Sequence, residues 1–297
     1  MGDDLRRLNS LAGKCAAPRA AYTPSMAARS AELDQRPRPS PVGRLLQHWR
    51  RVRRMSQLDL AVEARVTPRH VSFVESGRAR PSREMVLVLA RALDVPLRER
   101  NQMLLAAGYA PVYRETGVDE PAMSQVRAAL DRVLRHHEPF PAVVMDRHWD
   151  ILMANAAATV MFAWLLGGEP SERPANVLRL MFDPAGLRPF VANWEQVGEA
   201  LVQRAHREAI GGVPDARTAA LLQELLALPG VPERWRAPDL TAAPLPVIPV
   251  EFRKGRLAVS YFSMVTTVGT PQDVTAQEIR LESFFPADGA TEAQRWT

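Results

Sequence analysis

The sequence predicts two domains, an all-α domain of five short helices followed by a larger α+β domain. Its length of 297 residues corresponds to about two domains of ordinary size. Apolar residues recur at helical spacing as far as Gly108, whereas short runs with strand character begin after Pro139. The charge changes as well, because residues 1–110 hold 20 of the 38 Lys and Arg but only 10 of the 33 Asp and Glu. This basic N-terminal part favours a polyanionic partner. The alternative is that the excess positive charge is simply solvated and has no partner.

The composition excludes several classes of protein. Hydrophobic residues make up 46% of the chain and charged residues 24%, which is typical of a soluble globular protein rather than a wholly disordered one. The single cysteine, Cys15, excludes an internal disulfide or a CxxC zinc site and fits a cytoplasmic protein. Ile151–Gly168 carries no charge, but Asn155 and the final glycine pair favour a strand leading into a buried helix over a membrane span.

Residues 1–40 mix Ala, Arg, Pro and Ser without apolar periodicity, which predicts a disordered basic arm. Such an arm is either an inert tail or a further contact to nucleic acid.

Residues 41–108 are expected to form the helical domain. Ser56 begins the second helix, with Asp59 at the position of a capping box, and Thr67 followed by Pro68 begins the third. That third helix ends near Gly77, since glycine is favoured just after a helix. The five helices are predicted at 42–52, 56–64, 68–76, 81–93 and 94–108.

Only Arg65, Val66 and the cap Thr67 separate the second and third of these helices, which predicts a helix-turn-helix. The third helix would then project into a DNA major groove, with Arg69 reading guanine and Phe73 meeting a thymine methyl group. Gln57 and Thr67 lie at helix N-termini, which favour phosphate. The predicted DNA-contacting residues are Gln57, Thr67, Pro68, Arg69, His70, Phe73, Arg78 and Arg80.

Four segments of this region resemble the XRE family of regulators, which have a lambda-repressor-like helix-turn-helix domain. The segments are Ser56-Gln-Leu-Asp-Leu-Ala61, Val66-Thr67, Val74-Glu-Ser-Gly-Arg78 and Arg80-Pro-Ser82. The resemblance implies an ion pair between Arg50 and Glu75 that fastens the recognition helix to the scaffold. The chain departs from the family in the tight turn, where Arg65 replaces the usual glycine; a positive φ at such a residue costs about 1 kcal/mol.

Residues 109–138 are predicted to be a linker with a connecting helix, and residues 139–297 a separate α+β domain. The linker is rich in Tyr, Pro and Gly, and Met123–His137 has helical character. The last expected strand alternates Ile279 and Leu281 with charged neighbours, which predicts one solvated face. The expected strands are 142–146, 149–153, 250–252, 257–265 and 278–285, with helices at 155–166 and within 190–228.

The rear domain resembles the MmyB-like ligand-binding domain. The resemblance rests on Pro141–Asp146, Trp149–Ala157, Asn176, Leu178–Phe182, Asn193-Trp194 and the two late strands. It implies a PAS-like fold behind an XRE head and a pocket that holds a fatty acid or another apolar small molecule. The candidate lining residues are Met145, Leu152, Phe162, Trp164, Leu180, Phe182, Trp194, Val259 and Tyr261, the alternative for each being an ordinary core position.

No catalytic or metal site is predicted. Adjacent helical positions diverge by about 100°, so His136 and His137 cannot easily share one ion. No Ser, Cys or Lys stands in a known nucleophile motif.

We therefore expect a sequence-specific DNA-binding transcription regulator that forms a homodimer, because one recognition helix reads only a few base pairs. Its rear domain is expected to make DNA binding responsive to a small molecule. Three alternatives stay open: a rear domain that only dimerises or binds a protein partner, an enzyme with a DNA-binding head, and a general nucleic-acid binder.

Overall fold

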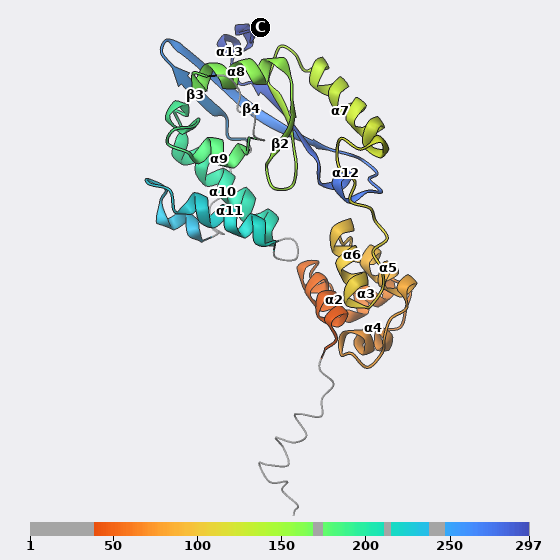
Figure 1. Ribbon diagram of the computed structural model, residues 1–297. Helices are drawn as coiled ribbons and strands as arrows, with labels where there is room; N and C mark the ends of the chain where they lie inside the picture. The colour runs from red at the N-terminus through yellow and green to blue at the C-terminus, as the bar shows by residue number, and fades with distance from the viewer. Residues whose placement is uncertain (1–38, 169–174, 211–214, 238–246, 297) are drawn as a thin grey trace, which may run out of the picture.

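A computed structural model describes residues 39–168, 175–210, 215–237 and 247–296 of the protein. Figure 1 shows two lobes, a small helical one and a larger one built on a sheet, joined by the chain between α6 and α7. The predicted fold class is therefore confirmed: a helix-turn-helix domain precedes an α+β, PAS-like domain. The arm predicted at 1–40 lies outside the described residues except for its last two positions.

The small domain consists of helices whose starts are set by side-chain caps. Ser40, Ser56, Thr67 and Ser82 each accept a hydrogen bond from a backbone N–H in the first turn of the helix that follows. Ser56 and Asp59 form the predicted capping box. The helices are α2 (Pro41–Val52), α3 (Gln57–Glu63), α4 (Pro68–Glu75), α5 (Arg83–Ala92) and α6 (Leu97–Ala106).

One apolar core holds these helices together. Leu46 and Trp49 of α2, Leu60 of α3, and Val71 and Val74 of α4 are all buried in it. Burial of each large apolar side chain contributes about 1.5–3 kcal/mol. The inward positions of Val71 and Val74 leave the opposite side of α4 to the solvent, as the helix-turn-helix prediction requires.

The larger domain contains a five-stranded antiparallel sheet in the order β2-β1-β5-β4-β3. The first strand of the domain, β1, therefore lies beside the last, β5, at the centre. The strands are β1 (Ala142–Met145), β2 (Ile151–Ala154), β3 (Val250–Lys254), β4 (Leu257–Thr267) and β5 (Arg280–Pro286).

Helices cover both faces of this sheet. Val143 and Met145 of β1 face the large core beneath α8 to α11, whereas Ala142 and Val144 pack against α7 and α12 on the other face. The helices are α7 (Ser124–His136), α8 (Ala156–Leu166), α9 (Val177–Phe182), α10 (Trp194–Ile210), α11 (Ala216–Leu226), α12 (Val274–Glu278) and α13 (Gly289–Ala293), with short 3-10 turns at 121–123, 188–190 and 233–236.

Two sequence expectations for this domain are wrong in detail. Trp149 lies in the turn between β1 and β2 with a φ of 68°, not in the strand. The predicted solvated face of the last strand is covered, because Glu282 is only 8% exposed, and Glu278 ends α12 instead of beginning β5. The uncharged stretch from Ile151 forms β2 and α8, as expected, with Asn155 as the cap of α8.

Candidate DNA-contacting surface and ligand cavity

The turn between α3 and α4 has the tight geometry that a helix-turn-helix needs. Arg65 adopts a φ of 55°, in the left-handed region, and the N–H of Val66 donates to the carbonyl of Ala61 at 2.9 Å. The strain that the sequence predicts at Arg65 is therefore present. This turn sets α4 across α3, with α4 as the recognition helix.

An ion pair fastens the end of α4 to α2. The Arg50 guanidinium donates from Nε and Nη2 to the two carboxylate oxygens of Glu75, at 2.7 and 3.0 Å. Gln57 Nε2 donates to the same carboxylate at 2.7 Å, and Glu75 is only 2% exposed. The hydrogen bond to Glu75 raises the pKa of Arg50 above its ordinary value. The structure thus contains the Arg50–Glu75 pair that the family resemblance implies.

The backbones of α2 and α4 also approach each other closely. A Cβ atom added to Gly43 would lie 2.6 Å from the carbonyl oxygen of Glu75, which no side chain could tolerate. Glycine is therefore required here for the contact that holds the recognition helix against α2.

The outer face of α4 presents an aromatic ring between two guanidinium groups. The Arg69 guanidinium lies 5.1 Å from the centre of the Phe73 ring, and that of Arg78 lies 5.9 Å from it. Both arginines are exposed, whereas Phe73 is half-buried. The Phe73 ring therefore packs against the two cations, each contact contributing about 0.5–1 kcal/mol.

The other predicted DNA-contacting residues have mixed surroundings. Thr67 and Pro68 are exposed at the start of α4, and His70 is half-buried. The Gln57 side chain is bound to Glu75, which leaves the backbone N–H groups at the start of α3 for a phosphate. Arg80 Nη2 donates to the carbonyl of Ala107 at 3.2 Å and the guanidinium lies over the Tyr109 ring, so this side chain contacts the end of α6.

A cavity of about 640 Å³ lies in the larger domain. One wall is the sheet face that carries Val143 and Met145, and helices α9 and α10 form the opposite wall. Its volume is within the range of about 300–1,000 Å³ that is usual for small-molecule sites. Met145, Phe162 and Leu180 line it, as the sequence predicts. Val143, Phe252 and Phe284 extend the same apolar wall.

The other six candidate lining residues do not line this cavity. Phe182 is fully buried beneath α10, where its ring packs edge-on against Trp194 at 4.8 Å between ring centres. Tyr261 is fully buried, and its hydroxyl accepts a hydrogen bond from Trp296 Nε1 at 2.9 Å. Val259 is a buried core residue.

Two of the six point outward. Leu152 and Trp164 are each 37% exposed, and the Trp164 ring lies 5.7 Å from that of the buried Trp296. The sequence shows that these residues are apolar but not which way their side chains point. Core, surface and cavity-lining residues therefore could not be distinguished from the sequence.

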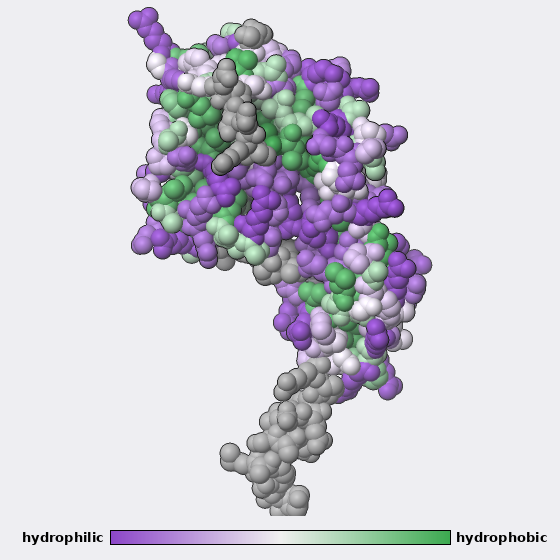
Figure 2. Space-filling view, in the orientation of Figure 1, coloured by the Kyte–Doolittle hydropathy of each residue, from purple (hydrophilic) through white to green (hydrophobic). Residues whose placement is uncertain are grey.

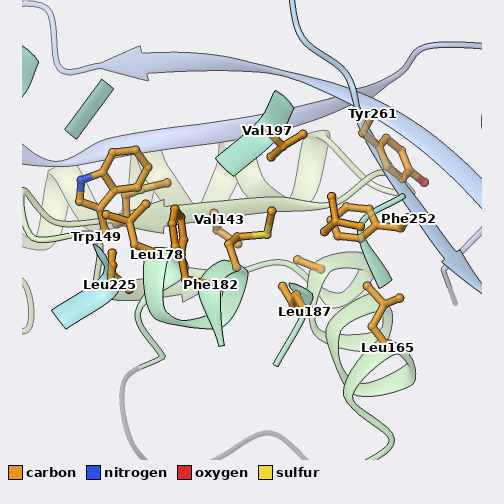
Figure 3. Close-up of a cluster of buried hydrophobic side chains, with 14 of the residues drawn as sticks. Val143, Trp149, Leu165, Leu178, Phe182, Leu187, Val197, Leu225, Phe252 and Tyr261 are labelled. Carbon is orange, nitrogen blue, oxygen red and sulfur yellow. The ribbon is translucent and has the colours of Figure 1, made fainter. Parts of the chain in front are cut away.

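Sequence reasoning missed the polar wall of the cavity. Arg204 of α10 lies with its guanidinium 4.4 Å from the centre of the Trp149 ring and 3.5 Å from the Glu282 carboxylate. Ser263 Oγ donates to Glu282 at 2.5 Å, and all four residues line the cavity. Trp149 packs beside Leu178 and Leu225 at one end of the core, as Figure 3 shows.

The two domains meet at a polar junction, which forms part of the hydrophilic band between the lobes in Figure 2. Arg98 at the start of α6 donates from Nε and Nη2 to the two oxygens of Glu278, at 2.7 and 2.9 Å. The N–H of Leu97 donates to the Gln277 side chain at 2.7 Å. Arg147, from the β1–β2 turn, contacts the same Glu278 at 3.2 Å.

The neighbours of Arg147 in this turn reach other parts of the domain. His148 Nδ1 lies 3.2 Å from the carboxylate of Asp215, which caps α11. Burial lowers the pKa of His148, although the nearby Asp215 charge acts in the opposite direction. Trp149 lines the cavity. One short turn therefore contacts both the cavity, through Trp149, and Glu278, which binds Arg98 of the helical domain.

Comparison with known families agrees with this architecture. The model of a helix-turn-helix domain matches residues 41–103. The model of the MmyB-like transcription regulator ligand binding domain matches residues 126–296, which is more than half of the chain. The chain belongs to the MmyB-like transcription regulators. The matched ligand-binding domain contains the whole cavity lining, from Val143 to Phe284.

Curated proteins and solved structures give no further information on this MmyB-like regulator. No curated protein matches the chain. One solved structure, described as an RNA-binding Light-Oxygen-Voltage receptor, is 13% identical with a TM-score of 0.27, and the alignment covers 89% of this chain and 64% of that one. The chain therefore spans less than two thirds of that protein's length.

The described residues of the regulator lack two features, a membrane-spanning helix and a metal-binding cluster. None of their helices is long and apolar enough to cross a membrane. They contain no group of three or more His, Cys, Asp or Glu side chains arranged to hold a metal ion. His137 Nε2 lies 2.8 Å from the carbonyl oxygen of Phe284, whereas His136 is exposed.

Proposed function

We propose that this MmyB-like regulator reads DNA as a homodimer and that an apolar or amphiphilic small molecule changes its affinity for the operator. The observation that carries the proposal is the β1–β2 turn, in which Trp149 lines the cavity and Arg147 contacts Glu278, the partner of Arg98.

The DNA-reading part of the proposal rests on the outer face of α4. Arg69 is exposed, its guanidinium can donate two hydrogen bonds to guanine, and Phe73 restricts its orientation. Because α4 has only two turns, it reads a few base pairs. A homodimer on two half-sites, about 34 Å apart or a multiple of that, supplies the rest of the specificity.

The ligand-responsive part rests on the cavity and its position. A ligand that enters the cavity contacts Trp149, and the backbone carries any displacement of this residue to Arg147 two positions earlier. Arg147 shares Glu278 with Arg98, so the displacement reaches α6 of the DNA-binding head. A ligand that binds two conformations unequally then changes DNA affinity, typically by 1–3 kcal/mol.

We also propose that the protein acts by binding rather than by catalysis. The polar residues that meet in the cavity, Arg204, Glu282 and Ser263, form an ion pair and a hydrogen bond with one another. Among the described residues that line the cavity there is no histidine, the side chain that most often acts as the general base for a serine nucleophile. The alternatives of a purely dimerising rear domain and of a general nucleic-acid binder differ in what the following experiment would show.

The experiment selects an operator from random DNA and measures its affinity for the full chain with and without saturating acyl compounds that raise the melting temperature. We expect a change of about 5- to 150-fold in operator affinity, and a mass of two chains per operator. Stabilising compounds that leave affinity unchanged would indicate a rear domain that only assembles. Equal affinity for all sequences would indicate a general nucleic-acid binder.

A further inference from the structure

We propose that the cavity selects an amphiphile whose polar head is uncharged and both donates and accepts hydrogen bonds, such as an amide, over one with a carboxylate head. This inference rests on the proposed function, because it assumes that an amphiphile occupies the cavity.

The two sides of the cavity have different chemistry. The sheet side is largely apolar, with Val143, Met145, Phe252 and Phe284, and its polar members are Ser263 and Glu282. Helix α10 contributes polar side chains beside the apolar Val197, Ala200 and Leu201. Gln196, Glu199, Gln203 and Arg207 follow one another at three- and four-residue intervals, which places them on one helix face, and Arg204 lies next to Gln203. A ligand that fills such a space has an apolar chain along the sheet and a polar group toward α10.

The most buried polar side chain of the lining comes from the sheet and is an acid. Glu282 lies on the central strand β5 and is only 8% exposed. Its carboxylate accepts a hydrogen bond from Ser263 at 2.5 Å and lies 3.5 Å from the Arg204 guanidinium. The positive charge of Arg204 is therefore already balanced within the cavity wall.

A carboxylate head placed against Arg204 would also lie beside Glu282. Two carboxylates in one poorly solvated site cannot both be ionised without a large cost, so binding would require one of them to take up a proton. An amide head avoids this cost. Its carbonyl oxygen can accept from Arg204 and its N–H can donate to Glu282, since an ionised carboxylate offers about four acceptor positions.

The rim of the cavity provides the competing site for a charged head. Arg207 is exposed and Glu199 is half-exposed on the same face of α10. An ion pair at such a solvated position contributes only about 0–1 kcal/mol. A carboxylate held at the rim would therefore gain little from Arg207.

The test compares two probes of equal chain length, decanoate and decanamide, by calorimetric titration of the full chain at neutral pH. We expect decanamide to bind at least about tenfold more tightly, which corresponds to about 1.4 kcal/mol. Glu282→Gln should remove most of this preference by strengthening decanoate binding. Glu199→Gln removes the same charge from the rim and should leave the preference unchanged.

Each outcome has a distinct meaning. Decanoate that binds the unmodified protein as tightly as decanamide overturns the inference, even if Glu282→Gln does not fold. A preference that Glu199→Gln abolishes while Glu282→Gln retains it places the head at the rim and also overturns it. If neither probe binds, the ligand-binding part of the proposed function fails together with this inference. Equal binding of the two probes overturns the inference alone, so the two failures can be told apart.

Discussion

Arg98 of α6 and Glu278 of α12 form a two-point ion pair across the junction of the two domains, with donor–acceptor distances of 2.7 and 2.9 Å. The pair is largely shielded from solvent, since the two side chains are 25% and 19% exposed. Glu115 of the linker also binds Arg98. The hydrogen bond to Glu278 raises the pKa of Arg98, which keeps this guanidinium protonated.

The first prediction concerns this pair. Glu278→Gln should lower the free energy of unfolding by about 1–3 kcal/mol, because hydrogen bonds to charged groups are lost. It should also weaken the effect of a bound ligand on operator affinity. Urea unfolding and operator titration measure the two effects. Glu224→Gln is the matched control, since Glu224 forms the same two-point pair with Arg179 at an exposed site. Equal losses in both variants would argue against a special role of the junction.

The second prediction concerns the attachment of the recognition helix. Glu75→Ala should destabilise the head by about 3–5 kcal/mol, because it leaves Arg50 and Gln57 without their buried partner. Thermal unfolding followed by circular dichroism measures the loss. Glu63→Ala removes an exposed acid from the neighbouring helix and should have little effect. A loss below about 1 kcal/mol for Glu75→Ala would contradict the predicted role of the pair.

The third prediction concerns base reading by α4. Arg69→Ala should weaken operator binding by about 1–3 kcal/mol and relax the choice of base at particular positions. Phe73→Leu should give a smaller loss in the same direction, because the support for Arg69 and Arg78 is removed. Binding to a panel of single-base operator variants measures both. Arg91→Ala alters an exposed arginine of α5 and serves as the control. A uniform loss over all operator variants would assign Arg69 to phosphate contact.

The fourth prediction concerns the tight turn. Arg65→Gly should raise the free energy of unfolding by less than about 1 kcal/mol, because relief of the positive φ is partly offset by the larger backbone entropy of unfolded glycine. The same change should reduce operator affinity equally for all base sequences, and lower the salt dependence of binding, if Arg65 contacts a phosphate. Chemical unfolding and salt titrations separate the two effects. Destabilisation by glycine would show that Arg65 makes a compensating contact.

The fifth prediction concerns Glu99, which is only 7% exposed on α6. Burial raises its pKa above 4.5, although the nearby Arg147 charge opposes this. The folded protein therefore holds this proton more tightly than the unfolded chain, so stability falls as the pH rises through the raised pKa. Glu99→Gln should be more stable than the unmodified protein at neutral pH, with the difference shrinking toward pH 4.5. Urea midpoints across this range measure it, and a constant difference would contradict the assignment.

Local signals in the sequence predicted the head well. Ser56 and Thr67 are caps because their oxygens satisfy N–H groups three residues later, which is a short-range property, and the same property made Asn155 predictable as the cap of α8 in the larger domain. The Arg65 turn and the Arg50–Glu75 pair also follow from spacing and family resemblance. In each case the contact that determines the structure is local in sequence or belongs to a motif shared by the family.

The cavity depends on contacts between distant segments, and the sequence predicted it less well. The alternation around Glu282 indicates a solvated face, but α10, about 80 positions earlier in the chain, covers that face and turns the acid inward. Phe182 and Trp194 have the composition of a ligand pocket, yet Trp235 completes a closed aromatic cluster with them. Apolar spacing shows that a residue is buried without showing what buries it.

Helix α6 has a consequence for protein engineering. Met103 and Leu104 at its end belong to the core of the DNA-binding head, while Leu97 and Arg98 at its start bind α12 of the other lobe. The head is therefore not an interchangeable module. Under the proposed function, a chimera that grafts a foreign head onto the larger domain would have to recreate the first turn of α6 to keep the contacts with Gln277 and Glu278.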